Sequence, residues 1–249
     1  MFISLWQQTN GSIFNAVGVL IGALIGLLFR NSLPPRIANT LQSGIGLTTL
    51  FLGMRIAWGL SEISIHGVAG IVIALVTITV GGGIGEALKL DARLESLAIN
   101  VQKRLGQGND HRFSEGLFAA FLIFCVGPVT ILGSIDNGLQ GDNQLLIIKT
   151  VLDTITAAAL ASTYGLGVLV SAVPLLLFQG GISLTAGSLA ALVPDPTHNP
   201  TVLIATCTGG IILLGLGLNL LDITKLRIAA YLPALVLGPI MVWALQTFL

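Results

Sequence analysis

Long runs of apolar residues, separated by short polar turns, follow one another along the whole chain. The runs are continuous rather than alternating, and most approach the ~20 residues that a helix needs to cross a bilayer. Lipid permits only helices and closed barrels to span it, and continuous runs favour helices. The pattern therefore predicts an all-α polytopic transmembrane helix bundle of seven or eight spans. The eight spans are predicted at 11–30, 37–60, 66–88, 114–134, 144–163, 166–191, 201–221 and 228–248.

The distribution of basic residues supports the eight-span count and predicts an orientation. Only "TYG" (163–165) separates the fifth span from the sixth, so a count of seven, with one long or re-entrant segment there, stays open. In the eight-span arrangement the loops on one side hold nine of the eleven Lys and Arg residues, and the opposite loops hold none. Because cytoplasmic loops carry the excess of Lys and Arg, both termini are predicted on the outer side. The nine are Arg30, Arg36, Lys89, Arg93, Lys103, Arg104, Arg112, Lys225 and Arg227.

Composition identifies the solvent and excludes several classes of protein. The chain is 54% hydrophobic and only 9% charged, whereas a soluble domain carries about 25% charged residues. The bilayer is therefore the expected partner, and a net charge of zero offers no basic face for nucleic acid. The three histidines, His66, His111 and His198, match no metal-ligand spacing, and no catalytic motif is present. We expect no enzyme activity, no cofactor and no metal.

The whole chain, 1–249, is predicted to be a single integral membrane domain. Residues 1–105 hold three spans and a further segment, 92–105, whose apolar residues repeat at helical spacing opposite charged ones. That pattern is typical of an amphipathic helix in the membrane interface, and a short soluble hairpin is the alternative. Residues 106–112 read as a flexible link, and 113–249 hold four to five further spans. Three segments, 21–37, 80–94 and 213–228, echo one another, which indicates internal repeats or glycine packing that arose independently.

The first span carries small residues at a spacing that favours close helix packing. Gly18, Gly22 and Gly26 form a doubled G-x-x-x-G, whose groove lets another helix approach closely. The partner helix belongs either to the same chain or to a second subunit. A dimer or trimer is compatible with this groove.

Two irregular stretches concentrate polar residues within predicted spans. In 126–142, Gly127–Pro128 interrupts the fourth span, and Asp136 and Asn137 follow. In 174–187, Gln179 lies in a second glycine-rich, proline-containing stretch. Discontinuous helices form substrate sites in many transporters, while an ordinary proline kink followed by a polar loop is the alternative for the first stretch. Asn15, within the first span, is expected to bridge helices.

Lys149 and Asp153 introduce two charges into the apolar run "IIKTVLDTIT". Spaced four apart, they share a helix face. Lys149 is close enough to the outer end of the span to extend to the headgroups. Asp153 lies about 12 Å deep at 1.5 Å per residue, where an acid costs about 2.5–3.5 kcal/mol on insertion scales. The side chain of Asp153 must therefore face protein or water, either as the structural partner of Lys149 or as the carrier of a proton or cation.

Long blocks of the sequence resemble a known bacterial family. They are "LPPRI", "GPVTILGSIDNGLQGD", "KTVLDTITAAALASTYGLGVLVSAVPLLLFQGG" and "TGGIILLGLGLNLLDITKLRIAAYLPAL". With the glycine-spaced first span, they are similar to the inner-membrane family known as domain of unknown function 554, over nearly the whole chain. The resemblance implies a polytopic protein of the bacterial inner (plasma) membrane with a transporter role, and it carries over no substrate and no site residues.

Together these patterns predict a small-solute or ion transporter or channel. Its polar path is predicted at Asp136, Asn137, Lys149, Asp153 and Gln179. The alternative is a non-transporting membrane scaffold or assembly factor whose intramembrane polar residues only join helices.

Overall fold

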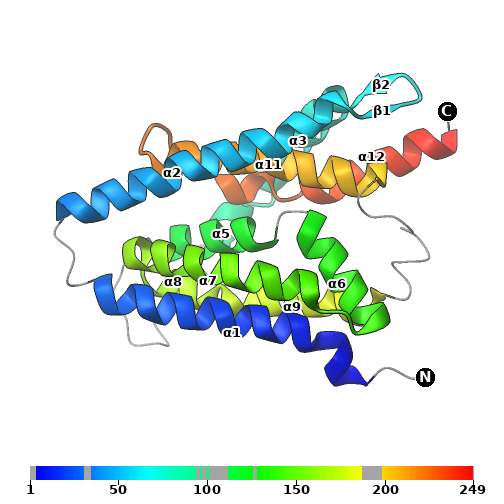
Figure 1. The fold of residues 1–249 in the computed structure, drawn as a ribbon. Helices are drawn as coiled ribbons and strands as arrows, with labels where there is room; N and C mark the ends of the chain where they lie inside the picture. Colours follow the sequence, from blue (N-terminus) through cyan, green and yellow to red (C-terminus); the bar gives the residue numbers. More distant parts are fainter. Residues whose placement is uncertain are drawn as a thin grey trace. The chain divides into compact units, whose positions relative to one another are not determined.

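The computed structural model describes residues 4–30, 35–93, 96, 100, 112–125, 128–186 and 198–248. Within them the fold is almost entirely helical (Figure 1), and its one sheet is the short antiparallel hairpin of β1 (Ser64–Ile65) and β2 (Val68–Ala69). The helices are α1 (Leu5–Arg30), α2 (Pro35–Trp58), α3 (Gly70–Ala87), α5 (Arg112–Cys125), α6 (Pro128–Gln140), α7 (Gln144–Tyr164), α8 (Leu166–Val170), α9 (Ala172–Leu184), α11 (Pro200–Leu220) and α12 (Ala234–Phe248), with short 3-10 turns η1 (Gly59–Ser61) and η2 (Ile228–Tyr231).

The prediction of an all-α polytopic membrane protein is confirmed. Among the described residues, six helical segments are long and apolar enough to cross a membrane, and a seventh is counted if the bent pair α5–α6 forms one span. The second predicted span folds as α2, which has 24 residues but is not counted among the segments apolar enough to cross a membrane. Polar residues such as Gln42 and Arg55 make α2 less apolar than the other long helices.

Breaks between helices occur where the sequence places residues unsuited to a continuous helix. Between α7 and α8 the chain turns at Gly165, whose φ of +72° is a conformation that favours glycine. This turn separates the fifth predicted span from the sixth. Helix α5 ends at Cys125 and α6 begins at Pro128, with a bend of 64° between them. Proline has no N–H for the preceding turn, so the interruption falls where it was predicted.

Several predictions lie outside the described residues. Most of the interfacial helix at 92–105, the link at 106–111, Gly127, and the end of the sixth span beyond residue 186 belong to this group. The side of the membrane on which each loop lies also stays a prediction.

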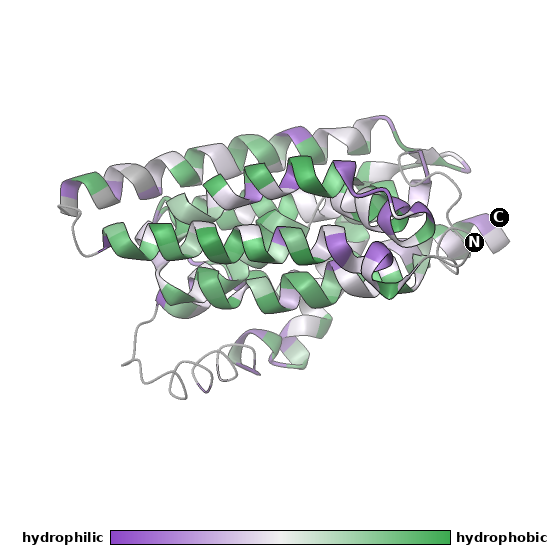
Figure 2. Cartoon of the chain, turned by 60° about the horizontal axis from the view of Figure 1, so that its bottom comes forward, coloured by the Kyte–Doolittle hydropathy of each residue, from purple (hydrophilic) through white to green (hydrophobic). Residues whose placement is uncertain are grey.

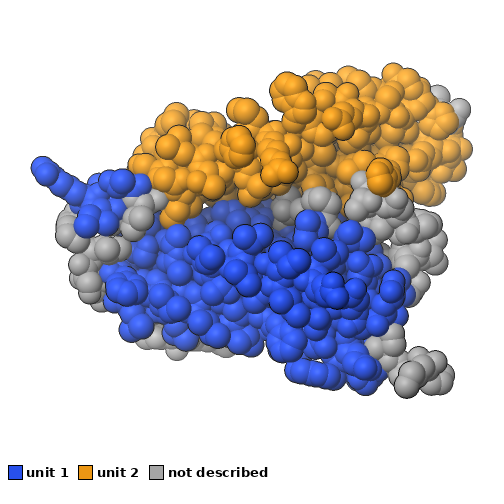
Figure 3. Space-filling view, in the orientation of Figure 1, with its two compact units in different colours: residues 1–42, 101–196 blue, residues 43–100, 197–249 orange. Residues whose placement is uncertain are grey.

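The described residues group into two compact units, each built from two separate stretches of chain (Figure 3). Unit 1 comprises Met1–Gln42 and Val101–Pro196, and unit 2 comprises Ser43–Asn100 and Thr197–Leu249. Each unit therefore takes residues from both of the halves, 1–105 and 113–249, that the sequence suggested. Helix α1 joins α5–α9 in unit 1, while most of α2 joins α3, α11 and α12 in unit 2.

Unit 1 is organised around close packing of α1 on α7. A Cβ added at Gly22 would lie 2.1 Å from the backbone oxygen of Thr154, and one at Gly26 would lie 2.2 Å from that of Ala158. At Gly18 the added atom would meet the side chain of Thr150 at 2.5 Å. The glycine stripe thus faces a helix of the same chain, and its groove is filled without a second subunit.

Unit 2 has its own apolar core between α3, α11 and α12. Ile73, Ala74, Ile204, Cys207 and Val242 are buried there in one cluster. Glycines again permit close approach: a Cβ at Gly85 of α3 would lie 1.9 Å from the backbone oxygen of Ala230.

Hydrophobic residues predominate along the helices, as Figure 2 shows, and many of their side chains are exposed. On α7, for example, Ile148, Leu152 and Ile155 are all more than half exposed. Water would penalise so much exposed apolar surface, whereas lipid acyl chains would not. These faces agree with a chain that spans the membrane.

Candidate functional site

A buried ion pair lies on α7, in the middle of unit 1. Lys149 Nζ is 2.5 Å from Asp153 Oδ2, and the two side chains are only 10% and 8% exposed. The Lys149 ammonium also lies 6.0 Å from the centre of the Phe124 ring, on α5. The interpretation that Lys149 extends to the headgroups is therefore wrong, because its charge is held inside the protein by a carboxylate one turn away.

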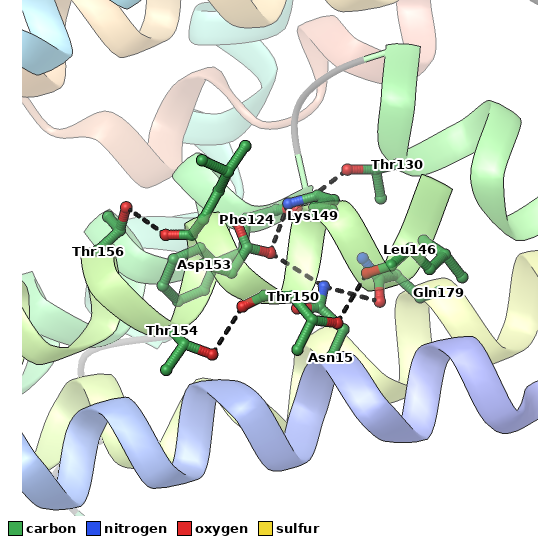
Figure 4. Close-up of polar contacts among 11 residues, drawn as sticks. Asn15, Phe124, Thr130, Leu146, Lys149, Thr150, Asp153, Thr154, Thr156 and Gln179 are labelled. Carbon is green, nitrogen blue, oxygen red and sulfur yellow. Dashed lines mark hydrogen bonds and ion pairs between the residues drawn. The ribbon is translucent and has the colours of Figure 1, made fainter. Parts of the chain in front are cut away.

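Two neighbouring helices each contribute a carboxamide to this pair. Asn15 of α1 donates from Nδ2 to Asp153 Oδ2 over 2.9 Å and to Gln179 Oε1, on α9, over 3.2 Å. Figure 4 shows these side chains converging from three helices. We call Asn15, Lys149, Asp153 and Gln179 the Asp153 cluster.

The orientation of both carboxamides follows from the charge of Asp153. The carboxylate accepts hydrogen bonds, so Asn15 must present its NH₂ group to it. That same NH₂ group reaches Gln179, which must then present its oxygen. As a result, Asn15 Oδ1 and Gln179 Nε2 point elsewhere, and both are buried with no hydrogen-bond partner among the described residues.

The small residues of α1 place Asn15 within reach of α7. Ser12, Asn15, Gly18 and Gly22 lie on one buried face of α1, at spacings of three and four residues. Because the glycines have no side chains, the backbone of α1 approaches α7 closely enough for Asn15 to reach Asp153. On the same face, the Ser12 and Ser183 hydroxyls lie 3.4 Å apart and join α1 to α9.

Asn137 makes a separate connection from α6 to α1. Its Oδ1 accepts from the backbone N–H of Gly11 over 3.1 Å, and its Nδ2 donates to the backbone oxygen of Gln7 over 2.9 Å. These two backbone groups are four residues apart and would bond to each other in a regular helix. The carboxamide thus binds both backbone groups at this turn of α1, which bends near its N-terminal end in Figure 1. Asn137 Nδ2 also reaches Asn10 Oδ1.

The structure brings together three of the five residues predicted for a polar path. Lys149, Asp153 and Gln179 belong to the Asp153 cluster, whereas Asn137 binds the beginning of α1. Asp136 is half-buried on α6, and no described contact joins it to the cluster.

Asn15 was predicted only as a bridge between helices, and it proves to be the link between Asp153 and Gln179. Its position three residues before Gly18, on the glycine stripe, was the signal in the sequence. Among the described residues, no group of three or more His, Cys, Asp or Glu side chains could hold a metal ion.

Comparison with known proteins places the chain in a family. The model of the protein family of unknown function DUF554 matches residues 10–243. The chain belongs to this family. An uncharacterized membrane protein of Bacillus subtilis, YdfK, is 30% identical over 96% of this chain and 97% of its own length. The uncharacterized protein YqgA of Escherichia coli is 29% identical over 92% of this chain and 94% of its own length.

No solved structure matches the chain. The resemblance to domain of unknown function 554 is confirmed by the family match, and the Bacillus relative agrees with it. The name of the Bacillus relative and the apolar helices agree on a multi-pass membrane protein. Neither name states a substrate.

Proposed function

We propose that this DUF554 protein moves a small solute or ion across the bacterial inner membrane, along a path that includes the Asp153 cluster. The observation that carries the proposal is the convergence of four buried polar side chains, two of them charged, from three helices of unit 1. One interrupted helical segment, the bent pair α5–α6, belongs to the same unit, whereas α8 and α9 together count as a single span. Broken helices around polar residues are a common design of substrate sites in transporters.

The cost of the cluster supports a functional role. Each charged side chain at the centre of a bilayer costs about 2.5–3.5 kcal/mol on insertion scales. Apolar residues of similar volume often hold helices together as well as, or better than, a buried ion pair. Polar residues whose only role is to join helices would therefore cost free energy that apolar residues would not. Ionisable residues at such depth commonly line ion and proton pathways.

The test is flux in proteoliposomes. With Asp153→Asn we expect at least a tenfold loss of solute-driven or ion-driven flux, because the variant keeps the shape of the side chain but loses its charge. Glu86→Gln is the matched control: Glu86 pairs with Arg227 in unit 2, where the side chains are 57% and 64% exposed. Unchanged flux through Asp153→Asn would overturn the role of Asp153.

A second candidate function is a non-transporting scaffold, which is favoured by two observations. Lys149 and Asp153 neutralise each other, and Asn137 acts only as a link between helices. The double variant Lys149→Met/Asp153→Asn separates the two functions, since it removes both charges together. A transporter that uses Asp153 stays inactive in this variant, whereas a scaffold keeps its fold and its effect on the cell.

The proposed location also has a direct test. With both termini outside the inner membrane, alkaline phosphatase fused at residue 249 is active and green fluorescent protein fused there is dark. The opposite pair of results would reverse the orientation.

A further inference from the structure

We propose that the Asn15–Gln179 carboxamide pair is the binding site for an uncharged solute that carries both a hydrogen-bond donor and an acceptor, such as a small amide or polyol. This inference rests on the proposed transport function and adds the class of substrate. It is drawn from the two unpartnered atoms, the charge balance of the cluster and the two glycines that follow Gln179 on α9.

The two unpartnered atoms have opposite hydrogen-bonding character. Asn15 Oδ1 only accepts, and Gln179 Nε2 only donates. Both are buried without a partner in the described part of the chain, and both residues are 0% exposed. Native proteins satisfy most buried polar atoms, so this pair stands ready for a group that donates to one atom and accepts from the other.

The charge balance of the cluster selects against ions. Lys149 and Asp153 lie 2.5 Å apart and cancel each other. Asn15 contacts this neutral pair through its Nδ2, which donates to Asp153 Oδ2. A buried ion needs a counter-charge, and the only charges of the cluster are already paired with each other. A neutral solute needs none.

Two glycines follow Gln179 on α9, and an added side chain would meet little at either of them. Gly180 is buried, yet a Cβ added there would meet no atom within 4 Å beyond its own helix neighbours. The same is true at Gly181, which is half-exposed. Successive residues of a helix are about 100° apart, so Gly181 faces almost away from Gln179, while Gly180 lies at its flank.

The experiment uses purified full-length protein in proteoliposomes with a fixed set of probes. The uncharged probes are urea, acetamide and glycerol, followed by light scattering. The charged probes are Na⁺, K⁺, methylammonium, chloride and acetate, followed by ion-selective electrodes or isotope uptake. Protein-free vesicles give the background.

Two pairs of variants locate the site. Gln179→Met keeps the length of the side chain and removes its NH₂ group. Its control, Thr208→Val, removes a buried hydroxyl of unit 2 that also has no described partner. Gly180→Val adds a side chain at the flank of Gln179, and Gly181→Val adds the same side chain on the side of the helix that faces almost away from Gln179.

We expect at least one uncharged probe to move faster than background. Gln179→Met should slow that flux about tenfold, the value of one typical net hydrogen bond, and Gly180→Val should slow it as well. Thr208→Val and Gly181→Val should stay close to the unmodified chain. Gel filtration of each variant confirms that the protein remains folded.

The outcomes separate the two proposals. One result is the movement of an ion, with its flux abolished by Asp153→Asn and unchanged by Gln179→Met. That result would overturn the proposal of an uncharged substrate and support the proposal of transport. If an uncharged probe moves equally fast through Gln179→Met, Gly180→Val and their two controls, the Asn15–Gln179 site is overturned. Flux of none of the probes above background would overturn both proposals.

Discussion

The sharpest prediction on stability concerns the Lys149–Asp153 pair. Both side chains are at least nine-tenths buried, and Asp153 Oδ2 accepts from both Lys149 Nζ and Asn15 Nδ2. Removing one partner of such a pair leaves a buried charge uncompensated and costs about 3–5 kcal/mol. We therefore expect Lys149→Met and Asp153→Asn each to lower the free energy of unfolding by that amount.

The double variant should be far more stable than the sum of the single changes implies. With both charges absent no desolvated ion is left, and the carboxamide introduced at position 153 still offers an oxygen to Asn15. We expect Lys149→Met/Asp153→Asn to lie within about 2 kcal/mol of the unmodified chain. The coupling energy of the cycle should therefore amount to several kcal/mol, well above the usual additivity error of about 0.3–0.5 kcal/mol.

The assay is reversible unfolding in mixed detergent micelles, followed by circular dichroism. The Glu86–Arg227 pair supplies the internal comparison, because its side chains are more than half exposed. Glu86→Gln and Arg227→Met should each cost no more than about 1 kcal/mol. Two results would contradict this coupling: single variants at 149 and 153 as mild as those at the exposed pair, or a double variant that loses the full sum of the two single effects.

Two further predictions concern the packing of α1. Gly22→Ala should lower the free energy of unfolding by about 1–3 kcal/mol, because its Cβ would lie 2.1 Å from the Thr154 backbone oxygen. Gly83→Ala on α3 is the control: its Cβ would meet nothing within 4 Å, so this variant should be neutral or stabilising. Equal thermal midpoints of the two variants would contradict the packing. Asn137→Ala should lower the free energy of unfolding by about 1–3 kcal/mol. It should also speed hydrogen exchange at the Gly11 amide, because the carboxamide that accepts from this amide is lost. Unchanged exchange at Gly11 would show that Asn137 does not hold this turn.

The spans and their breaks could be predicted because they depend on local physics. Continuous apolar runs in lipid must be helical, whatever they pack against. Proline at position 128 and a glycine at position 165 interrupt those helices through their own backbone preferences. The same reasoning identified Asp153 as a residue that must face protein or water, because a short acidic side chain cannot reach the headgroups from that depth.

The partners of these residues could not be predicted, because they come from distant parts of the chain. Asn15 and Asp153 are separated by 138 positions and Asn15 and Gln179 by 164, and spacing along a single helix says nothing about which other helix lies opposite. Asp136 and Asn137 are neighbours in sequence, yet only Asn137 is directed at α1. Successive residues of a helix point about 100° apart, so packing alone selects which one meets the next helix.

The sequence by itself determined the solvent, the helical class, most of the helix boundaries and the family of this protein. Each of these depends on composition, periodicity or contiguous motifs. Only the tertiary structure decided that the glycine stripe of α1 packs on α7 of the same chain, that Lys149 is held inside by Asp153, and that Asn15 joins this pair to Gln179. Those contacts arise when helices far apart in sequence pack within one unit, where a single ångström of approach decides whether a hydrogen bond forms.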